Sequence, residues 1–212
     1  MLRAEIVREL LVRGLTVFAF NQRSVIEIEQ MMLTLARISG VPEKGGELVE
    51  SMSQGLRAIA ASSSRFPRRP RVFFEEWSEP LISGIRWVEE LVEIAGGEPV
   101  FPELHSGRAG KERIVDAGEV ARRNPEVVIA SWCGRKVNKA AIRARPGWSA
   151  TAAVASNRIY EIKSTYILQP GPAALTEGVR QLHAILAHCA GVGVPPELAP
   201  AERTDPDLAR QA

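Results

Sequence analysis

Apolar and polar residues follow each other along the chain in patterns that predict helices separated by short strands. Residues 2–12 show the spacing of a helix, and residues 15–20 (LTVFAF) are apolar on both faces, as in a strand of a parallel sheet. Ser24 and Glu27 form a capping box, in which each side chain is expected to bond the other residue's backbone N–H. The helix that begins there carries apolar residues at helical spacing and ends at Gly40.

The rest of the pattern predicts an α/β fold with one parallel sheet. A helix over 47–62 precedes a stretch rich in Pro and Arg at 62–70, which we interpret as a boundary. Beyond it, strands alternate with helices, as in a parallel sheet with flanking helices. The predicted strands are 71–76, 126–131 and 158–162, and the predicted helices are 84–95, 116–123, a short one before the last strand, and 173–190. The tail at 191–212 is polar and rich in Pro, which predicts disorder.

Composition narrows the class of protein. The chain has 212 residues and 45% hydrophobic content, enough for one good core. A balance of 27 basic and 25 acidic residues does not indicate a nucleic-acid partner. Two cysteines and three scattered histidines lack the spacing of a disulfide framework or a metal site. The start lacks the pattern of a secretory signal, and no stretch reaches the roughly 18 apolar residues of a membrane helix, so we expect a cytoplasmic chain as written, with no membrane insertion.

Unusual residues follow three of the predicted strands. Trp77, Trp132 and Tyr166 each come just after a strand. Ligands of a parallel sheet gather beyond the carboxyl ends of its strands, so these aromatic side chains are expected along one edge. Together they predict a broad, flat and partly apolar ligand. The alternative is that each ring only packs into its own loop.

Two catalytic interpretations compete with a binding site. Cys133 precedes a basic loop, which would favour its thiolate, but a nucleophile also needs a base. The nearest downstream histidines, His183 and His188, lie on the last predicted helix. A second possibility is acid–base chemistry by the glutamates that follow the strand at 71–76, which are Glu75, Glu76 and Glu79. We expect a protein that is not an enzyme, and we keep a small cytoplasmic α/β enzyme using Cys133 as an alternative.

Three segments resemble the second lobe of the periplasmic-type cobalamin-binding proteins, which are substrate-binding proteins of ABC transporters. These segments are RVFFEEWSEPLISGIRWVEELVEIAGGEPVF, NPEVVIASWCG and RIYEIKSTYILQPGPAAL, with GW at 147–148 before the last strand. The resemblance covers about residues 15–190 and implies two α/β lobes joined by one long helix. Residues 1–45 then resemble only the last strand and helix of the first lobe, 46–70 the interlobe helix and hinge, and 71–190 the second lobe. We therefore expect a truncated product, a mis-assigned start or a non-functional remnant.

The resemblance also implies what the chain binds. Cobalamin or a related corrinoid is the expected ligand, held without covalent chemistry and without a bound cofactor, in the periplasm. Haem and iron–siderophore binders share the architecture and are the alternative. The implied ligand-binding residues are Glu76, Trp77, Leu81, Trp132, Cys133, Tyr166 and Gln169. An open wall of this kind would be an apolar patch, which favours self-association.

A transporter permease is the second partner that the resemblance implies. Family members dock onto it through a surface glutamate on each lobe. The matching position, seven residues before Pro125, is Gly118, and Glu119 is its neighbour. A displacement of one residue turns a side chain by about 100° around a helix. Glu119 is therefore the candidate docking residue, in an altered direction.

Overall fold

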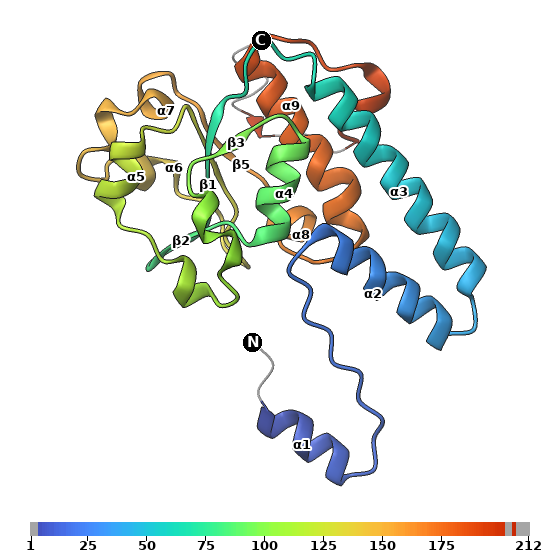
Figure 1. Cartoon of the computed structure of the whole chain (residues 1–212). Helices are drawn as coiled ribbons and strands as arrows, with labels where there is room; N and C mark the ends of the chain where they lie inside the picture. The colour runs from blue at the N-terminus through green and yellow to red at the C-terminus, as the bar shows by residue number, and fades with distance from the viewer. Residues whose placement is uncertain (1–3, 202–204, 207–212) are drawn as a thin grey trace.

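The computed structural model describes residues 4–201 and 205–206, and a five-stranded sheet lies at its centre (Figure 1). The strand order is β2-β1-β4-β5, and β3 also pairs with β1. Strands β1, β3, β4 and β5 are parallel, which confirms the α/β prediction, whereas β2 is an unpredicted antiparallel edge strand. The strands are β1 (Arg71–Ser78), β2 (Leu81–Ser83), β3 (Glu98–Pro99), β4 (Val127–Ala130) and β5 (Ile159–Glu161).

Helices cover both faces of the sheet, with α3, α4 and α9 on one side and α5, α6 and α7 on the other (Figure 1). The α-helices are α1 (Ala4–Val12), α2 (Val25–Ile38), α3 (Pro42–Ser63), α4 (Arg86–Ile94), α5 (Ala117–Arg123), α6 (Lys139–Arg143), α7 (Ala152–Ala155), α8 (Ser164–Ile167) and α9 (Val179–Ala190). Single turns are η1 (Pro102–Ser106), η2 (Gly110–Arg113), η3 (Trp148–Ala150), the π-helical η4 (Ala174–Gly178) and η5 (Pro196–Leu198).

The central strand β1 is buried on both faces, which is why its sequence reads as a nearly continuous apolar run. Val72 and Phe74 belong to the larger core, on the side of α4 and α9. Phe73 points to the smaller core, where its ring meets the Trp148 ring edge to face at 6.0 Å. Successive side chains of a strand point to opposite faces, so one short strand serves both cores.

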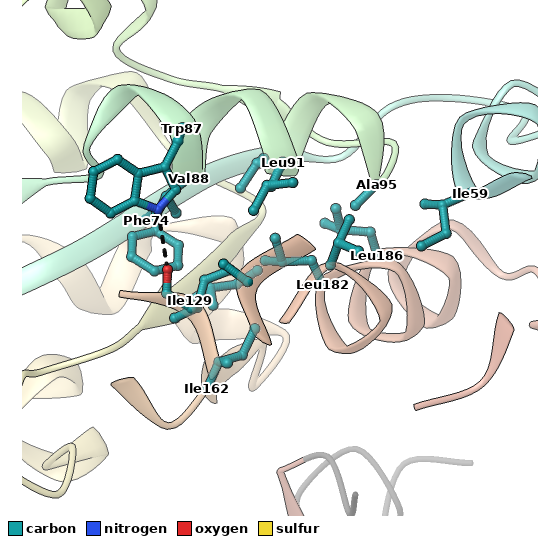
Figure 2. Packing of buried hydrophobic residues seen from close by; sticks show 14 of the residues in the cluster. Ile59, Phe74, Trp87, Val88, Leu91, Ala95, Ile129, Ile162, Leu182 and Leu186 are labelled. Atoms are coloured by element: carbon teal, nitrogen blue, oxygen red, sulfur yellow. Dashed lines mark hydrogen bonds between the residues drawn. The ribbon is translucent and has the colours of Figure 1, made fainter. Parts of the chain in front are cut away.

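Helix α9 holds the larger core together. Figure 2 shows Leu182 and Leu186 of α9 directed toward Leu91 of α4 and toward Ala95, which follows α4, with Ile59 of α3 beside them. Burial of such side chains is worth about 1.5–3 kcal/mol each, so this contact supplies much of the stability of the larger core. The sequence predicted one helix over 173–190, but its first turn is the π-helical η4.

The α2–α3 pair packs against the same core and is a close helical hairpin. Ser24 caps α2 by accepting a bond from the Glu27 N–H at 3.3 Å, as predicted, but the Glu27 carboxylate bonds the Arg23 N–H instead of Ser24. Helix α3 begins at Pro42, five residues earlier than predicted, because proline is favoured in a first helical turn. The predicted boundary at 45–46 therefore falls inside a continuous helix.

The predicted strand at 15–20 is wrong. These residues form no helix or strand, and Leu15 and Phe18 are more than half exposed. The segment runs away from the sheet, between α2 and α1, and α1 has no buried residue (Figure 1). A strand needs a neighbour to bond its backbone, and the described chain brings none to this segment.

The prediction of a disordered tail is wrong for residues 192–201. Leu198 in η5 is buried in the larger core, and Arg180 of α9 donates to the Ala199 carbonyl at 3.4 Å. Asp205 is also buried and accepts from Lys139 and from the Glu161 N–H, both at 2.6 Å. Apolar and charged anchors thus overcome a composition that is typical of disorder. Residues 202–204 and 207–212, also predicted to be disordered, lie outside the described residues.

A buried histidine ties three helices together. His183 of α9 is fully buried, with Nδ1 3.1 Å from the Ala95 carbonyl and Nε2 3.0 Å from the Ser62 hydroxyl. A carbonyl only accepts, so Nδ1 donates and Nε2 of the neutral ring accepts from Ser62. Burial lowers the pKa of His183, which favours this neutral form.

A buried carboxyl, Glu89, faces the turn after β2. It lies in the first part of α4, receives a bond from the Gly84 N–H, and leaves Oε2 without a hydrogen-bond partner. Burial raises the pKa of Glu89 to about 8, although Arg113 nearby acts in the opposite direction. Gly84 is needed here, because a Cβ at that position would lie 2.4 Å from Glu89 Oε1.

A pair of adjacent glycines in α3 provides a test of the α2–α3 packing. A Cβ on Gly45 would lie 2.2 Å from the Ala36 Cβ, whereas one on Gly46 would meet nothing within 4 Å. We expect Gly45→Ala to destabilise the protein by about 1–3 kcal/mol, because the helices must separate. Gly46→Ala should stabilise it by about 0.5–1 kcal/mol, because alanine is the better helix former. Urea unfolding followed by circular dichroism measures both, and equal effects would contradict the packing.

The Glu89 carboxyl makes stability depend on pH. Its pKa is raised from 4.5 to about 8, so the folded protein keeps a proton that the unfolded chain releases. The stabilisation is complete below pH 4.5 and is lost as the pH rises to about 8. Glu89→Gln imitates the protonated form, so its advantage over the wild type should grow to a few kcal/mol, about 1.4 per pKa unit, across this range.

Urea unfolding at a series of pH values measures this difference. Glu47→Gln removes an exposed carboxylate from α3, which does not act on the Glu89 pKa, and is the matched control. A difference between Glu89→Gln and the wild type that stays constant from pH 5 to pH 8.5 would refute the assignment.

Candidate functional site

Two consecutive glutamates at the carboxyl end of β1 organise this edge of the sheet. Glu75 has no exposed surface, and Arg145 binds it with two bonds of 2.6 and 2.8 Å. Trp132, in the loop after β4, donates its Nε1–H to the same carboxylate at 3.1 Å. Glu75 therefore joins the end of β1 to two loops that lie 57 and 70 positions away in the sequence.

Glu76 points to the other face and is partly exposed. Arg113, which is itself buried, holds it with two bonds of 2.7 and 3.1 Å. The same guanidinium also donates to the Ser83 carbonyl, which anchors it to β2. The carboxylate is thus held in one orientation and still reaches solvent. A planar guanidinium and a carboxylate bonded in this double fashion form one of the stronger polar contacts in proteins.

An open cleft of about 490 Å³ lies beside Glu76. We call it the apolar cleft, because Glu76 is the charged residue in a mostly apolar lining. A volume of this size is typical of sites for small molecules. Its lining residues are Glu76, Trp77, Pro80, Ile82, Ile85, Trp87, Cys133 and Leu168.

A second cleft, of about 450 Å³, is lined mostly by residues with charged or polar side chains, and we call it the basic cleft. The two are joined by the loop after β4, because Cys133 lines one and Gly134 and Arg135 line the other. The Arg135 guanidinium lies 5.5 Å from the centre of the Trp77 ring and 6.0 Å from that of Trp132. The charged residues of the basic cleft are Arg135, Lys136, Glu161, Lys163 and Asp205.

Some of the predicted ligand-binding residues line a cleft, and the others do not. Glu76, Trp77 and Cys133 line the apolar cleft, and Tyr166 lines the basic cleft. The others do not line either cleft: Leu81 and Trp132 are buried in the smaller core, and Gln169 is exposed.

Tyr166 owes its position to a close approach between α8 and the start of α9. The Tyr166 carbonyl lies so near Gly178 that a Cβ there would be 2.4 Å from its oxygen. The ring of Tyr166 is half-buried against the larger core. Helix α8 was not predicted, because a single turn of four residues leaves no periodic pattern.

Three of the catalytic groups that the sequence offered are engaged in other contacts, namely His183, Glu75 and Glu76. Cys133 is exposed, but both ring nitrogens of His183 are already bonded within the larger core. Glu75 and Glu76 do not form an acid–base pair, because each is bound by its own arginine. Among the described residues, no group of three or more His, Cys, Asp or Glu is placed to hold a metal ion.

Several residues of the site carried no signal in the sequence. Arg113 and Arg145 read as ordinary loop cations, since nothing local marks a partner 37 or 70 positions away. Ile82, Ile85 and Trp87 did have a signal, because they follow Trp77 within the same quoted segment and β2 folds back along β1.

The candidate docking residue, Glu119, is in the first turn of α5. Its carboxylate forms ion pairs with Arg122 and with Arg123, the latter at 2.7 Å, and is about one-quarter exposed. Asp116 caps the helix by accepting from the Glu119 N–H at 3.0 Å. Glu119 is therefore on the surface, with part of its charge balanced by its own helix.

No helix of the described chain has both the length and the apolar character that a bilayer crossing requires. Among curated proteins, the chain is 23% identical over 185 residues to YvrC of Bacillus subtilis (strain 168), an uncharacterized ABC transporter substrate-binding lipoprotein. The match covers 84% of this chain and 56% of the relative, so the chain spans about half of the length of that protein.

Solved structures share the fold. The vitamin B12-binding protein BtuF of Vibrio cholerae superposes with a TM-score of 0.66 at 20% identity, covering 88% of this chain and 71% of that one. The haem-binding protein RhuT of Roseiflexus sp. RS-1 gives 0.75 at 18% identity, covering 89% and 73%. The sequence model of the periplasmic binding protein family matches residues 3–166, most of the chain. Sequence and fold agree, and the chain belongs to the periplasmic binding protein family.

Proposed function

We propose that the chain is the ligand-binding part of an ABC transporter substrate-binding protein and takes a flat, partly apolar macrocycle in the apolar cleft. The observation that carries this proposal is the position of that cleft, at the carboxyl edge of a parallel sheet, where ligands of α/β folds bind. Two indole rings and several aliphatic side chains offer contact area there, and Glu76 offers one oriented acceptor.

Cobalamin and haem are the two ligands that we consider. Cobalamin is favoured by the resemblance of the three quoted segments to cobalamin binders. Haem is supported equally by the fold, since solved structures described as haem-binding superpose as well as the B12-binding one. Siderophores remain in the same class. A Cys133-dependent enzyme has no supporting geometry in the described chain.

The family also bears on partner and place. The name of the family and the lipoprotein relative support a location outside the cytoplasmic membrane. They also support a transporter permease as a partner. This differs from the cytoplasmic location that the sequence as written suggested. We also propose that the chain self-associates. The reason is that α1, α2 and the segment between them expose apolar residues, including Leu11, Phe18 and Leu35.

Alkylation of Cys133 tests the proposed cleft. The chain has two free thiols, of which Cys133 is exposed in the apolar cleft and Cys189 is buried. A maleimide should therefore add once, at Cys133, in the folded protein. Cobalamin or haem in the cleft should slow this reaction several-fold, as followed by mass spectrometry. Cys133→Ser is the control for slow reaction at Cys189. An unchanged rate with both ligands, at concentrations near their solubility, would argue against the proposal.

A permease would test the docking residue. We propose that Glu119 meets an arginine of the permease, as the family resemblance implies. Glu119→Gln in the full-length protein should then lower the stimulated ATPase activity of its transporter several-fold. Glu98→Gln, at an exposed carboxylate in β3, is the matched control and should have no effect. Full stimulation by Glu119→Gln would show that this side chain is not used.

A further inference from the structure

The charged residues of the basic cleft indicate the chemistry of the ligand. We infer that the ligand carries an anionic oxygen group, a carboxylate or a phosphate, which enters the basic cleft while the apolar body lies in the apolar cleft. This rests on the proposed function and goes beyond it, because it selects an acidic macrocycle over one whose periphery is neutral.

The two clefts lie next to each other, because neighbouring residues of the loop after β4 line them. Cys133 and Gly134 are consecutive, and they line the apolar and the basic cleft respectively. Arg135 lines the basic cleft, and its guanidinium lies over the ring of Trp77, which lines the apolar one. In the segment after β5, Tyr166 lines the basic cleft and Leu168 lines the apolar cleft. A ligand resting on Trp77 therefore meets Arg135 at its edge.

Cations prevail in the basic cleft. Arg135, Lys136 and Lys163 line it, and all three are exposed and able to turn toward a ligand. The carboxylates there are already engaged: Asp205 pairs with Lys139, and Glu161 accepts from the Val137 N–H at 3.1 Å. The local charge that remains is positive, so an anion gains attraction in this cleft.

The chemistry of Arg135 favours an oxygen anion. A guanidinium presents a planar set of donors that matches a carboxylate or phosphate, and stacking on aromatic rings leaves those donors free at its edge. Ser164, Thr165 and Tyr166 add hydroxyl donors along the same cleft. This combination of cations and hydroxyls is unlike the lining of the apolar cleft.

A neutral ligand is expected to bind less tightly in the basic cleft. It would cover Arg135 and Lys163 and remove water from them without giving a counter-charge, and a buried unpaired charge is costly. Discrimination between ligands comes from such unmet groups as well as from favourable contacts. The basic cleft is thus expected to separate acidic from neutral macrocycles of the same size.

The test compares iron protoporphyrin IX with its dimethyl ester, which has the same ring but no free carboxylates. Binding to the 212-residue chain is measured by quenching of tryptophan fluorescence and by protection of Cys133. We expect the dicarboxylate to bind at least tenfold more tightly than the ester. Lys163→Gln and Arg135→Gln should each weaken binding of the dicarboxylate several-fold and should not weaken binding of the ester, because each removes a charge that the ester leaves unpaired. Lys44→Gln, at an exposed cation on α3, should change neither.

Competition identifies the anion. Displacement of the dicarboxylate by citrate at lower concentration than by inorganic phosphate would support a carboxylate site, and the reverse order would support a phosphate site. Equal affinity for the ester and the dicarboxylate would overturn the inference and leave the proposed function standing. If no macrocycle quenches or protects, the proposed function itself fails.

Discussion

The buried carboxylate of Glu75 is the contact on which the arrangement of the loops at the carboxyl edge of the sheet depends. A buried charge is tolerated only when it is paired, and Glu75 has both oxygens occupied by Arg145 and one of them also by Trp132. The loops after β4 and after α6 are thereby tied to the end of the central strand. The loop after β4 carries Cys133 and Arg135, so the positions of residues in both clefts follow from this one network. Removal of Arg145 would leave Glu75 as an uncompensated buried charge, at a cost of about 3–5 kcal/mol.

The sequence predicted the regular part of this arrangement better than the irregular part. β1, β4 and β5 have strong apolar runs between polar breaks, so their existence and the edge where they end could be predicted. The capping serine of α2 was also evident. Residues 15–20 have the same apolar character, but a strand forms only beside another strand, and pattern says nothing about neighbours. Likewise, the tail at 192–201 has the composition of disorder, yet Leu198 finds space in the core.

The candidate site was predictable in location and less so in detail. Trp77 and Cys133 could be placed beside the cleft because they lie at or just after the carboxyl ends of strands, whereas Trp132 follows a strand too and turns inward to Glu75. Which way a side chain points after a strand depends on distant partners, here Arg145. The sequence did not predict the basic cleft. Lys163 and Arg135 look like ordinary loop residues, and they come together only because β4 and β5 lie side by side. Membership of the periplasmic binding protein family supports a ligand at this edge, and the two linings are the basis of the ligand chemistry that we propose.

The positions of the tryptophans mean that fluorescence and circular dichroism report on different parts of this protein. All four tryptophans, Trp77, Trp87, Trp132 and Trp148, lie on the sheet and its nearest helices, and none is on α1, α2 or α3. Tryptophan emission therefore reports on the clefts and the two cores around the sheet, while circular dichroism is dominated by the helices, among which α3 is the longest. If the α2–α3 hairpin opened before the sheet, ellipticity would fall at lower denaturant than fluorescence changes. Two coincident transitions would instead show that the hairpin and the sheet unfold as one cooperative unit.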